Sequence, residues 1–95
     1  MKLLLTESDI QLAFAKYLRN LREQEKLSRE ALAEKSTVPA ATIKKFERTG
    51  QISFRQLLLL WQSLDDLQRL FQLIKEQTDK TALPNSIDEI LKDGI

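Results

Sequence analysis

Apolar residues recur at spacings of three and four along most of this chain, and that periodicity constrains the fold more than any other feature. Only two glycines and two prolines interrupt the 95 residues, and no run alternates apolar with polar side chains as a half-buried strand does. The chain is therefore predicted to be all-α. Helices are expected over approximately residues 9–25, 29–35, 39–49, 53–64 and 65–77.

Capping residues set the expected starts of three of these helices. Ser8 or Asp9 is the expected N-cap of the first helix, and Ser28 and Ser53 are the expected N-caps of the second and fourth. The first helix carries an apolar stripe that predicts the face it buries. That stripe consists of Ile10, Phe14, Tyr17, Leu18 and Leu21.

Proline and glycine mark the other boundaries. Pro39 has the fixed φ that suits the first turn of the third helix, and Gly50 is the expected residue after its end. Residues 78–85 are polar and contain Pro84, so they are predicted to be a linker. Ser86 is then the expected N-cap of a short last helix with apolar residues Ile87, Ile90 and Leu91.

The residue types that carry most enzyme chemistry are missing. The sequence has no cysteine and no histidine, which excludes disulfides, Cys/His zinc sites and histidine-based acid–base catalysis. Asp65 and Asp66 are adjacent, so on a helix they point about 100° apart and do not converge on a substrate. We expect a protein with no catalytic activity, no metal and no cofactor.

No segment has the pattern of a signal peptide or a membrane span. The apolar run Leu3–Leu5 is three residues long, whereas a signal peptide needs roughly 7–15. The run Leu57–Trp61 is five residues long, whereas a membrane span needs about 20. We expect a cytoplasmic protein that is associated with the nucleoid when it binds DNA.

The net charge of +1 hides an asymmetry along the chain. Residues 11–60 hold ten basic and five acidic side chains, a net charge of +5, and residues 61–95 hold four basic and seven acidic side chains, a net charge of −3. A basic body joined to an acidic end is typical of a protein whose body meets a polyanion. The alternative is a chance distribution of solvated surface charges.

Residues 28–48 have the spacing of a helix-turn-helix motif, with only Ser36-Thr37-Val38 between two short helices. Ala33 is small enough for the two helices to cross closely. Val38 supplies the apolar residue of the turn, and Ile43 supplies one in the second helix. In this motif the second helix enters the DNA major groove while the first crosses the backbone, so the pattern predicts a transcription regulator.

The same stretch resembles a known family. The run LREQEKLSREALAEK over residues 21–35 and the run VPAATIKKFER over residues 38–48 are similar to the lambda-repressor-like (XRE) helix-turn-helix domain. Gly50 and the leucine-rich segment from Ser53 to Leu64 continue the resemblance, which covers residues 9–75. It implies a five-helix DNA-binding domain over residues 1–77, followed by a short C-terminal extension over 78–95, and binding of operator DNA as a two-fold dimer.

The resemblance also implies roles for individual residues. Arg22 and Glu47 match the family's internal ion pair, and Leu21, Leu32, Val38, Ile43, Phe46 and Leu58 are expected in the core. With Ile43 and Phe46 inside, the opposite face of their helix points outward. The residues expected to contact DNA are Ser28, Arg29, Pro39, Ala40, Ala41, Thr42, Lys44, Lys45, Arg48 and Ser53. For the cations among them, the alternative is ordinary solvation.

Three residues at the start of the recognition helix depart from the family pattern. Pro39 stands where the family prefers Ser or Thr, and Ala40 and Ala41 stand where many members carry long polar side chains. Base recognition is therefore expected to use few contacts, with DNA shape supplying the rest. Because of the same departures, an alternative interpretation is a helical protein-interaction module that has lost DNA binding.

Four consecutive leucines, residues 57–60, cover every side of a helix, so this helix needs cover on most of its surface. A homodimer would provide the cover, and the alternative is a helix that is simply well buried. The expected dimer interface consists of Leu57, Leu60, Trp61, Leu67, Leu70 and Phe71.

Residues 47–50 and the leucine-rich segment after them resemble the HipB-like antitoxins of this family. That resemblance implies repression of the protein's own operon and binding of a HipA-type kinase toxin, with residues 78–95 as one candidate contact region. A stand-alone XRE-type repressor, from a phage or a chromosome, is the alternative.

Overall fold

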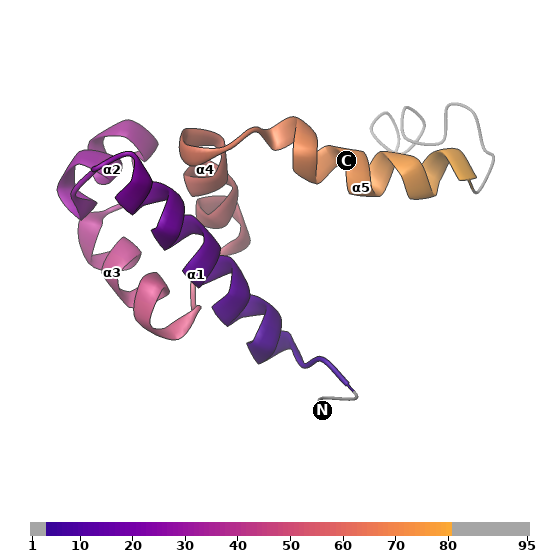
Figure 1. Cartoon of the computed structure of the whole chain (residues 1–95), viewed down its shortest axis with the longest axis horizontal. Coiled ribbons are helices and arrows are strands. Elements are labelled where there is room, and N and C mark those ends of the chain that lie inside the picture. The colour runs from indigo at the N-terminus through magenta and orange to yellow at the C-terminus, as the bar shows by residue number, and fades with distance from the viewer. Residues whose placement is uncertain (1–3, 81–95) are drawn as a thin grey trace.

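The structure, a computed structural model, describes residues 4–80. All regular secondary structure in that range is helical (Figure 1). In chain order the helices are α1 (Glu7–Gln24), α2 (Arg29–Ser36), α3 (Ala40–Thr49), α4 (Phe54–Leu64) and α5 (Leu67–Lys80). The predicted all-α, five-helix fold is confirmed. The helix expected after Ser86 lies outside the described residues.

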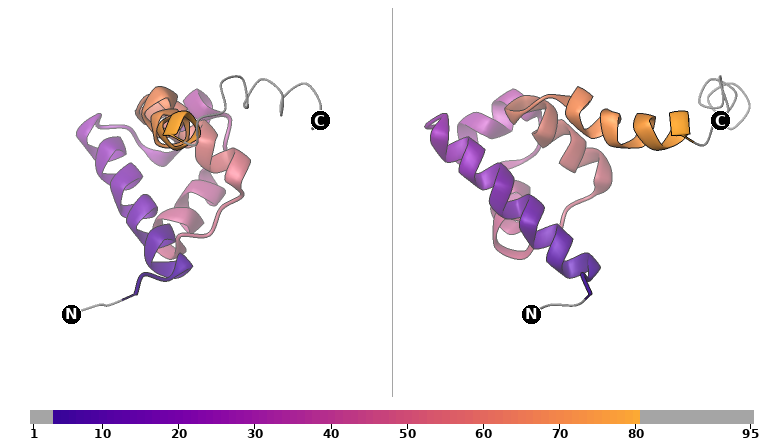
Figure 2. Two further views of the ribbon diagram at one scale, coloured as in Figure 1. Left: turned by 90° about the vertical axis from the view of Figure 1, so that its right-hand side faces the viewer. Right: turned by 45° about the vertical axis from the view of Figure 1, so that its right-hand side comes forward.

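The first four helices form a compact bundle, and α5 leaves it. Helix α1 packs against α3 and α4, and α2 packs against the same two helices. Helix α5 contacts α4 at its start and then projects away from the bundle, as the views in Figures 1 and 2 agree. Among residues 4–80, every helix is too short or too polar to cross a membrane.

The hydrophobic core lies between α1, α2, α3 and α4. Complete burial of a leucine, isoleucine or phenylalanine side chain stabilises a fold by roughly 1.5–3 kcal/mol, and every helix of the bundle contributes to this core. The buried apolar residues are Ala15, Leu18, Leu32, Val38, Ile43, Phe46, Leu60, Trp61 and Leu64.

Three apolar residues expected in the core or on the buried face of α1 lie elsewhere. Ile10 is 42% exposed, because its side chain lines the open apolar groove and not the closed core. Leu21 and Leu58 are half-buried. Leu21 packs on the outside of the core, whereas Leu58 lines a groove between the bundle and α5.

Helix α1 begins two residues before the expected position. Its N-cap is Thr6, not Ser8 or Asp9, and the Thr6 hydroxyl accepts a hydrogen bond from the Asp9 backbone N–H at 3.1 Å. The Asp9 carboxylate in turn accepts one from the Thr6 N–H at 2.9 Å. This reciprocal capping box satisfies two N–H groups that would lack partners in the helix. Ser28 and Ser53 are the N-caps of α2 and α4, as predicted.

The start and end of α3 depend on one proline and one glycine. Pro39 is the N-cap rather than the first helical residue, and it provides no side-chain hydrogen bond. Gly50 ends the helix as predicted, with a φ of 80°. A Cβ atom at Gly50 would lie 2.9 Å from the backbone carbon of Gln11. The glycine therefore permits both the left-handed backbone and the close approach of α1.

Helix α5 runs from Leu67 to Lys80, so it begins one or two residues later than expected. Its last three residues fall in the segment predicted to be a linker, and for residues 78–80 that prediction is wrong. Asp65 takes an extended conformation at the end of α4, and this break separates α4 from α5.

Candidate nucleic-acid interface

The turn between α2 and α3 fixes the angle between these helices. Thr37 has a left-handed φ of 68°, and its N–H donates to the carbonyl of Ala33 at 2.8 Å. The buried Ser36 hydroxyl accepts a hydrogen bond from the N–H of Val38 at 3.1 Å. Val38 is buried in the core. The three-residue connection between α2 and α3 is thus constrained by two hydrogen bonds and by a buried apolar side chain.

Helix α3 presents a basic face to solvent. Ile43 and Phe46 point into the core, and the charged residues Lys44, Lys45 and Arg48 are exposed. None of these three cations makes an ion pair among the described residues. Their charges are therefore available to an external anion. Of the uncharged residues expected to contact DNA, Pro39 and Ala41 are exposed, whereas Ala40 and Thr42 are half-buried.

A small polar pocket of about 540 Å³ lies between the N-terminal ends of α2 and α3. It brings together five of the residues expected to contact DNA, namely Ser28, Arg29, Ala40, Ala41 and Lys44. Arg22 and Glu30 complete its lining. The Ser28 hydroxyl accepts a hydrogen bond from the Ala31 N–H at 3.0 Å and keeps its own proton to donate.

The other expected contact residues are not in this pocket. Ser53 lies at the start of α4, where its hydroxyl accepts from the N–H of Gln56 at 3.1 Å. Thr42, Lys45 and Arg48 continue along α3. The interface is therefore one pocket with a basic helix face beside it, and the start of α4 is a separate position.

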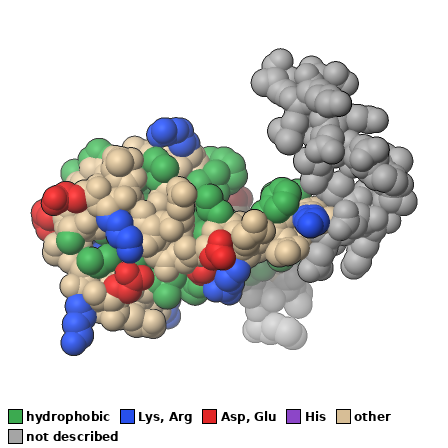
Figure 3. Space-filling model, turned by 90° about the horizontal axis from the view of Figure 1, so that it is seen from above, with side chains coloured by type: hydrophobic (Ala, Val, Ile, Leu, Met, Phe, Trp, Pro, Cys, Tyr) green, Lys and Arg blue, Asp and Glu red, His purple; other side chains and the backbone are tan. Residues whose placement is uncertain are grey.

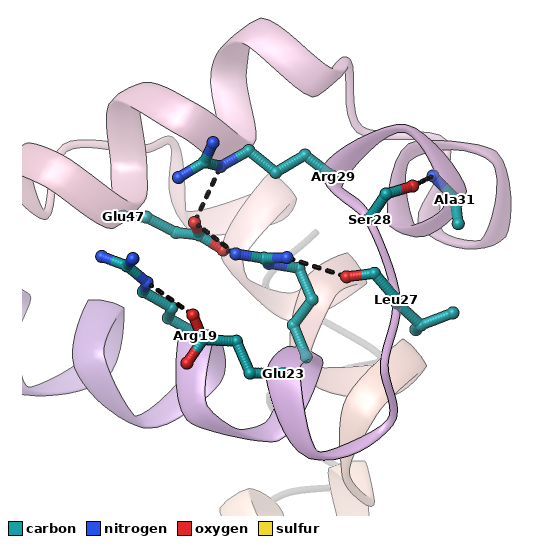
Figure 4. Close-up of polar contacts among 8 residues, drawn as sticks. Arg19, Glu23, Leu27, Ser28, Arg29, Ala31 and Glu47 are labelled. Atoms are coloured by element: carbon teal, nitrogen blue, oxygen red, sulfur yellow. Dashed lines mark hydrogen bonds and ion pairs between the residues drawn. The ribbon is translucent and has the colours of Figure 1, made fainter.

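Beneath the pocket, one carboxylate holds two arginines (Figure 4). Arg22 Nε and Nη2 donate to the two oxygens of Glu47 at 2.7 and 3.1 Å, so the ion pair implied by the family resemblance is present. Arg29 Nε also donates to Glu47, at 2.9 Å. The sequence reasoning missed this second partner. The only available signal was a cation at the first position of α2, which does not reveal a carboxylate 18 residues later.

The sequence matches the family described as helix-turn-helix domain over residues 13–81. The chain belongs to that family. The match spans more than half of the chain and includes all of α2, the turn and α3. No curated protein and no solved structure gives a significant match.

A helix-turn-helix domain binds DNA with its second motif helix, so DNA is the partner class that the family assigns to α3. Within residues 4–80, no group of three or more acidic side chains is arranged to hold a metal ion.

Away from the motif, a second feature of the helix-turn-helix domain is an apolar groove of about 950 Å³ between α1, α4 and α5. Figure 3 shows hydrophobic surface at the point where α5 leaves the bundle. Leu57, Leu67, Leu70 and Phe71, four residues of the expected dimer interface, line this groove. Its other large apolar residues are Ile10, Phe14, Phe46, Ile52, Phe54, Leu58, Leu73 and Ile74.

Two residues expected at the dimer interface are core residues instead. Leu60 is 1% exposed and Trp61 is 7% exposed within the single chain. Trp61 packs edge-on against Phe14, with ring centroids 5.7 Å apart. Neither side chain has enough free surface to meet a second copy, because α4 turns this side toward α1 and α2.

A polar cluster anchors the first turn of α5. The Tyr17 hydroxyl donates to the carboxylate of Asp65, and Arg69 Nη1 contacts that carboxylate at 2.9 Å and the Tyr17 hydroxyl oxygen at 3.1 Å. The hydrogen bond from Tyr17 is the main influence that lowers the pKa of Asp65 below its ordinary value. Desolvation raises this pKa, but the Asp66 N–H and Arg69 add to the lowering.

Proposed function

We propose that this helix-turn-helix domain is a sequence-specific repressor of the XRE type, without catalytic activity. The observation that carries the proposal is the exposed face of α3, where Lys44, Lys45 and Arg48 have no ion-pair partner among the described residues. Three unpaired cations on the helix that enters the major groove suit the phosphate-dominated affinity of DNA-binding proteins.

The proposed contacts follow from the chemistry of each position. The methyl groups of Ala41 and Thr42 pack on thymine methyl groups, and Lys45 donates to guanine O6 and N7. Lys44 and Arg48 point toward the flanking backbone. Ser28 and Ser53 contact phosphates at the starts of their helices, whereas Pro39 and Ala40 pack against the backbone without donating. With so few base contacts, DNA shape supplies part of the specificity.

The proposed repressor is a homodimer that uses the apolar groove. Its exposed residues include Phe71 at 41% and Ile74 at 61%, and apolar patches of this kind are uncommon on monomers. We propose that Leu57, Leu67, Leu70 and Phe71 face a second copy. Two-fold pairing of this kind matches palindromic operators.

A finer proposal rests on the resemblance of residues 47–50 and the following leucine-rich segment to HipB-like antitoxins. On this proposal the protein represses its own operon, acts in the cytoplasm and at the nucleoid, and binds a HipA-type kinase toxin. Co-expression with the product of the adjacent reading frame tests it. A stoichiometric complex that relieves kinase toxicity supports the antitoxin proposal. If no complex forms, the stand-alone repressor is favoured instead.

The DNA-binding proposal is tested with a labelled duplex from the protein's own promoter, titrated at ~50 and ~200 mM salt. The test variant is Lys44→Ala/Lys45→Ala. The matched control is Lys16→Ala/Lys75→Ala, which removes the same charge from exposed positions outside the motif. We expect tight, salt-dependent binding that is lost in the test variant and kept in the control.

Selection from random duplexes separates DNA binding from autoregulation. Binding to selected duplexes but not to the promoter would keep the DNA-binding function and reject self-repression. Absence of binding to either would reject both. It would favour the second candidate function, a protein-interaction module, for which the apolar groove is the supporting observation.

A further inference from the structure

The Glu47 carboxylate is shared by arginines from two other helices. Its side chain is 3% exposed and comes from α3, whereas Arg22 comes from α1 and Arg29 from α2. Two positive charges meet one negative charge here, so the cluster keeps a net charge of +1. A buried carboxylate with one bidentate arginine is already neutralised, and the second arginine therefore needs another explanation.

The two arginines differ in how many of their nitrogens are engaged. Arg22 uses all three, because Nη1 also donates to the carbonyl of Leu27 at 2.8 Å. Arg29 uses only Nε. Its two terminal nitrogens make no hydrogen bond within the described part of the chain, and its side chain is 31% exposed. The excess positive charge of the cluster therefore lies on the exposed end of Arg29.

The surroundings of that end suit an oxyanion. The polar pocket places Lys44 of α3 and the hydroxyl of Ser28 on the same concave surface as Arg29. Glu30 also lines the pocket, but it is exposed and its side chain can turn into solvent. Because Glu47 fixes Nε, the opposite edge of the planar guanidinium has a defined direction (Figure 4).

We propose that Arg29 binds one DNA phosphate through its two terminal nitrogens, and that Glu47 is the positioning residue that aims them. The inference rests on the proposed DNA-binding function. It assigns one contact with the DNA backbone to a site that is already formed in the free protein. A guanidinium can hold a carboxylate on one edge and a phosphate on the other. Lysine has no second edge, so Lys44 contributes a point charge to the same phosphate.

The first experiment measures how the affinity for a selected duplex depends on salt. Arg29→Gln is expected to reduce the slope of log K against log salt by about 0.9, the value of one phosphate contact. It is also expected to weaken binding roughly tenfold at ~100 mM salt. Arg29→Lys is expected to keep most of the slope but not the affinity. Arg19→Gln, another arginine beside a carboxylate, is the control and should leave the slope unchanged.

The second experiment tests whether Glu47 acts through Arg29. Glu47→Asp keeps the charge and shortens the side chain, so it should weaken DNA binding in the wild-type background. In the Arg29→Gln background it should have no further effect. A purely structural role for Glu47 would give the same loss of affinity in both backgrounds. Thermal unfolding of each variant, followed by circular dichroism, verifies that the fold is retained.

The outcomes separate two failures. If the wild-type protein binds no duplex at any salt, the proposed DNA-binding function fails. If it binds with a steep salt dependence but Arg29→Gln keeps the full slope, the phosphate site on Arg29 is wrong and the DNA-binding function stands. Equal effects of Glu47→Asp in both backgrounds would overturn the positioning role alone.

Discussion

The α1–α4 bundle and α5 are both amphipathic, but the bundle buries most of its apolar side chains in a core whereas α5 leaves most of its own exposed. Each bundle helix places at least one leucine or isoleucine in the core, such as Leu18 at 2% exposure and Ile43 at 0%. In α5, Leu67 is 37% exposed and Leu73 is 67% exposed. An amphipathic pattern therefore shows that a helix has an apolar face, but it does not show that the cover comes from the same chain.

The two regions also differ in what fixes them. The bundle is held by buried apolar side chains and by the Arg22–Glu47 ion pair. Helix α5 is held at its first turn by hydrogen bonds around Asp65 and by the bond from the Trp61 indole N–H to the Asp66 carbonyl, 2.9 Å long. Changes in the bundle should therefore affect global stability, and changes in α5 should mainly affect association.

The largest expected effect is in the bundle. Arg22→Ala removes one partner of a buried ion pair and leaves the Leu27 carbonyl without its donor. We expect the free energy of unfolding to fall by about 3–4 kcal/mol, measured by urea denaturation, because Arg29 still contacts Glu47 but does not replace the bidentate pair. Arg19→Ala, which breaks the exposed pair with Glu23, should change it by less than about 1 kcal/mol. Equal losses would show that the bundle does not depend on its buried pair.

Gly50→Ala tests the packing of α3 against α1. The new Cβ atom would meet the backbone of Gln11 at 2.9 Å, and alanine disfavours a φ of 80°. We expect a loss of about 2–4 kcal/mol in the free energy of unfolding. Gln51→Ala, at the exposed neighbouring position, is the control. A variant as stable as the wild type would mean that α1 can move away from α3 at little cost.

Phe71→Ser tests α5 as an association surface. Phe71 is 41% exposed in the single chain, so its loss should leave the bundle folded. We expect dimerisation to weaken by about 1.5–3 kcal/mol, the value of one apolar side chain buried at the interface. Analytical ultracentrifugation over a dilution series measures this change. Gln72→Ser, the exposed polar neighbour, should leave it unchanged, and an equal effect of both variants would contradict the proposed face.

The smallest expected effect concerns Asp65, whose pKa is lowered in the folded protein by the Tyr17 hydroxyl and other donors. The group therefore stabilises the fold above the pKa it has in the unfolded chain, and this stabilisation is lost as the pH falls through its folded pKa. Asp65→Asn should cost on the order of 1 kcal/mol at neutral pH and progressively less in acid.

Thermal unfolding at several pH values measures the difference in stability between the Asp65→Asn variant and the wild type. Tyr17→Phe removes the main cause of the shift and should flatten the same pH dependence. A difference that does not depend on pH would mean that the Asp65 carboxylate contributes only through the shape of its side chain.

Local signals were sufficient to predict most helix boundaries from the sequence. Ser28, Ser53 and Gly50 act through atoms within a few residues of themselves, so their roles are readable without a fold. The start of α1 was harder to place, because Thr6, Ser8 and Asp9 are all good N-caps. Only the reciprocal bonds of Thr6 and Asp9 select among them.

Features that depend on distant contacts could not be predicted. Four consecutive leucines cover all sides of α4, so the sequence did not distinguish the buried Leu60 from Leu58 in the groove. The second role of Glu47 depends on Arg29, and the direction of α5 depends on a bond between Tyr17 and Asp65, 48 residues apart. Periodicity predicts which face of a helix is apolar, whereas such contacts decide where that face lies.

The position of Trp61 gives the protein an intrinsic optical reporter. It is the single tryptophan of the sequence. The centroid of its ring lies 5.3 Å from that of Tyr17, and its indole N–H donates a hydrogen bond to the Asp66 carbonyl. Excitation energy absorbed by Tyr17 is therefore transferred to Trp61, and the emission wavelength of Trp61 depends on the hydrogen bond to Asp66. Fluorescence of the unlabelled, unmutated chain can follow the α4–α5 junction during association and DNA binding, separately from the helix content of the bundle.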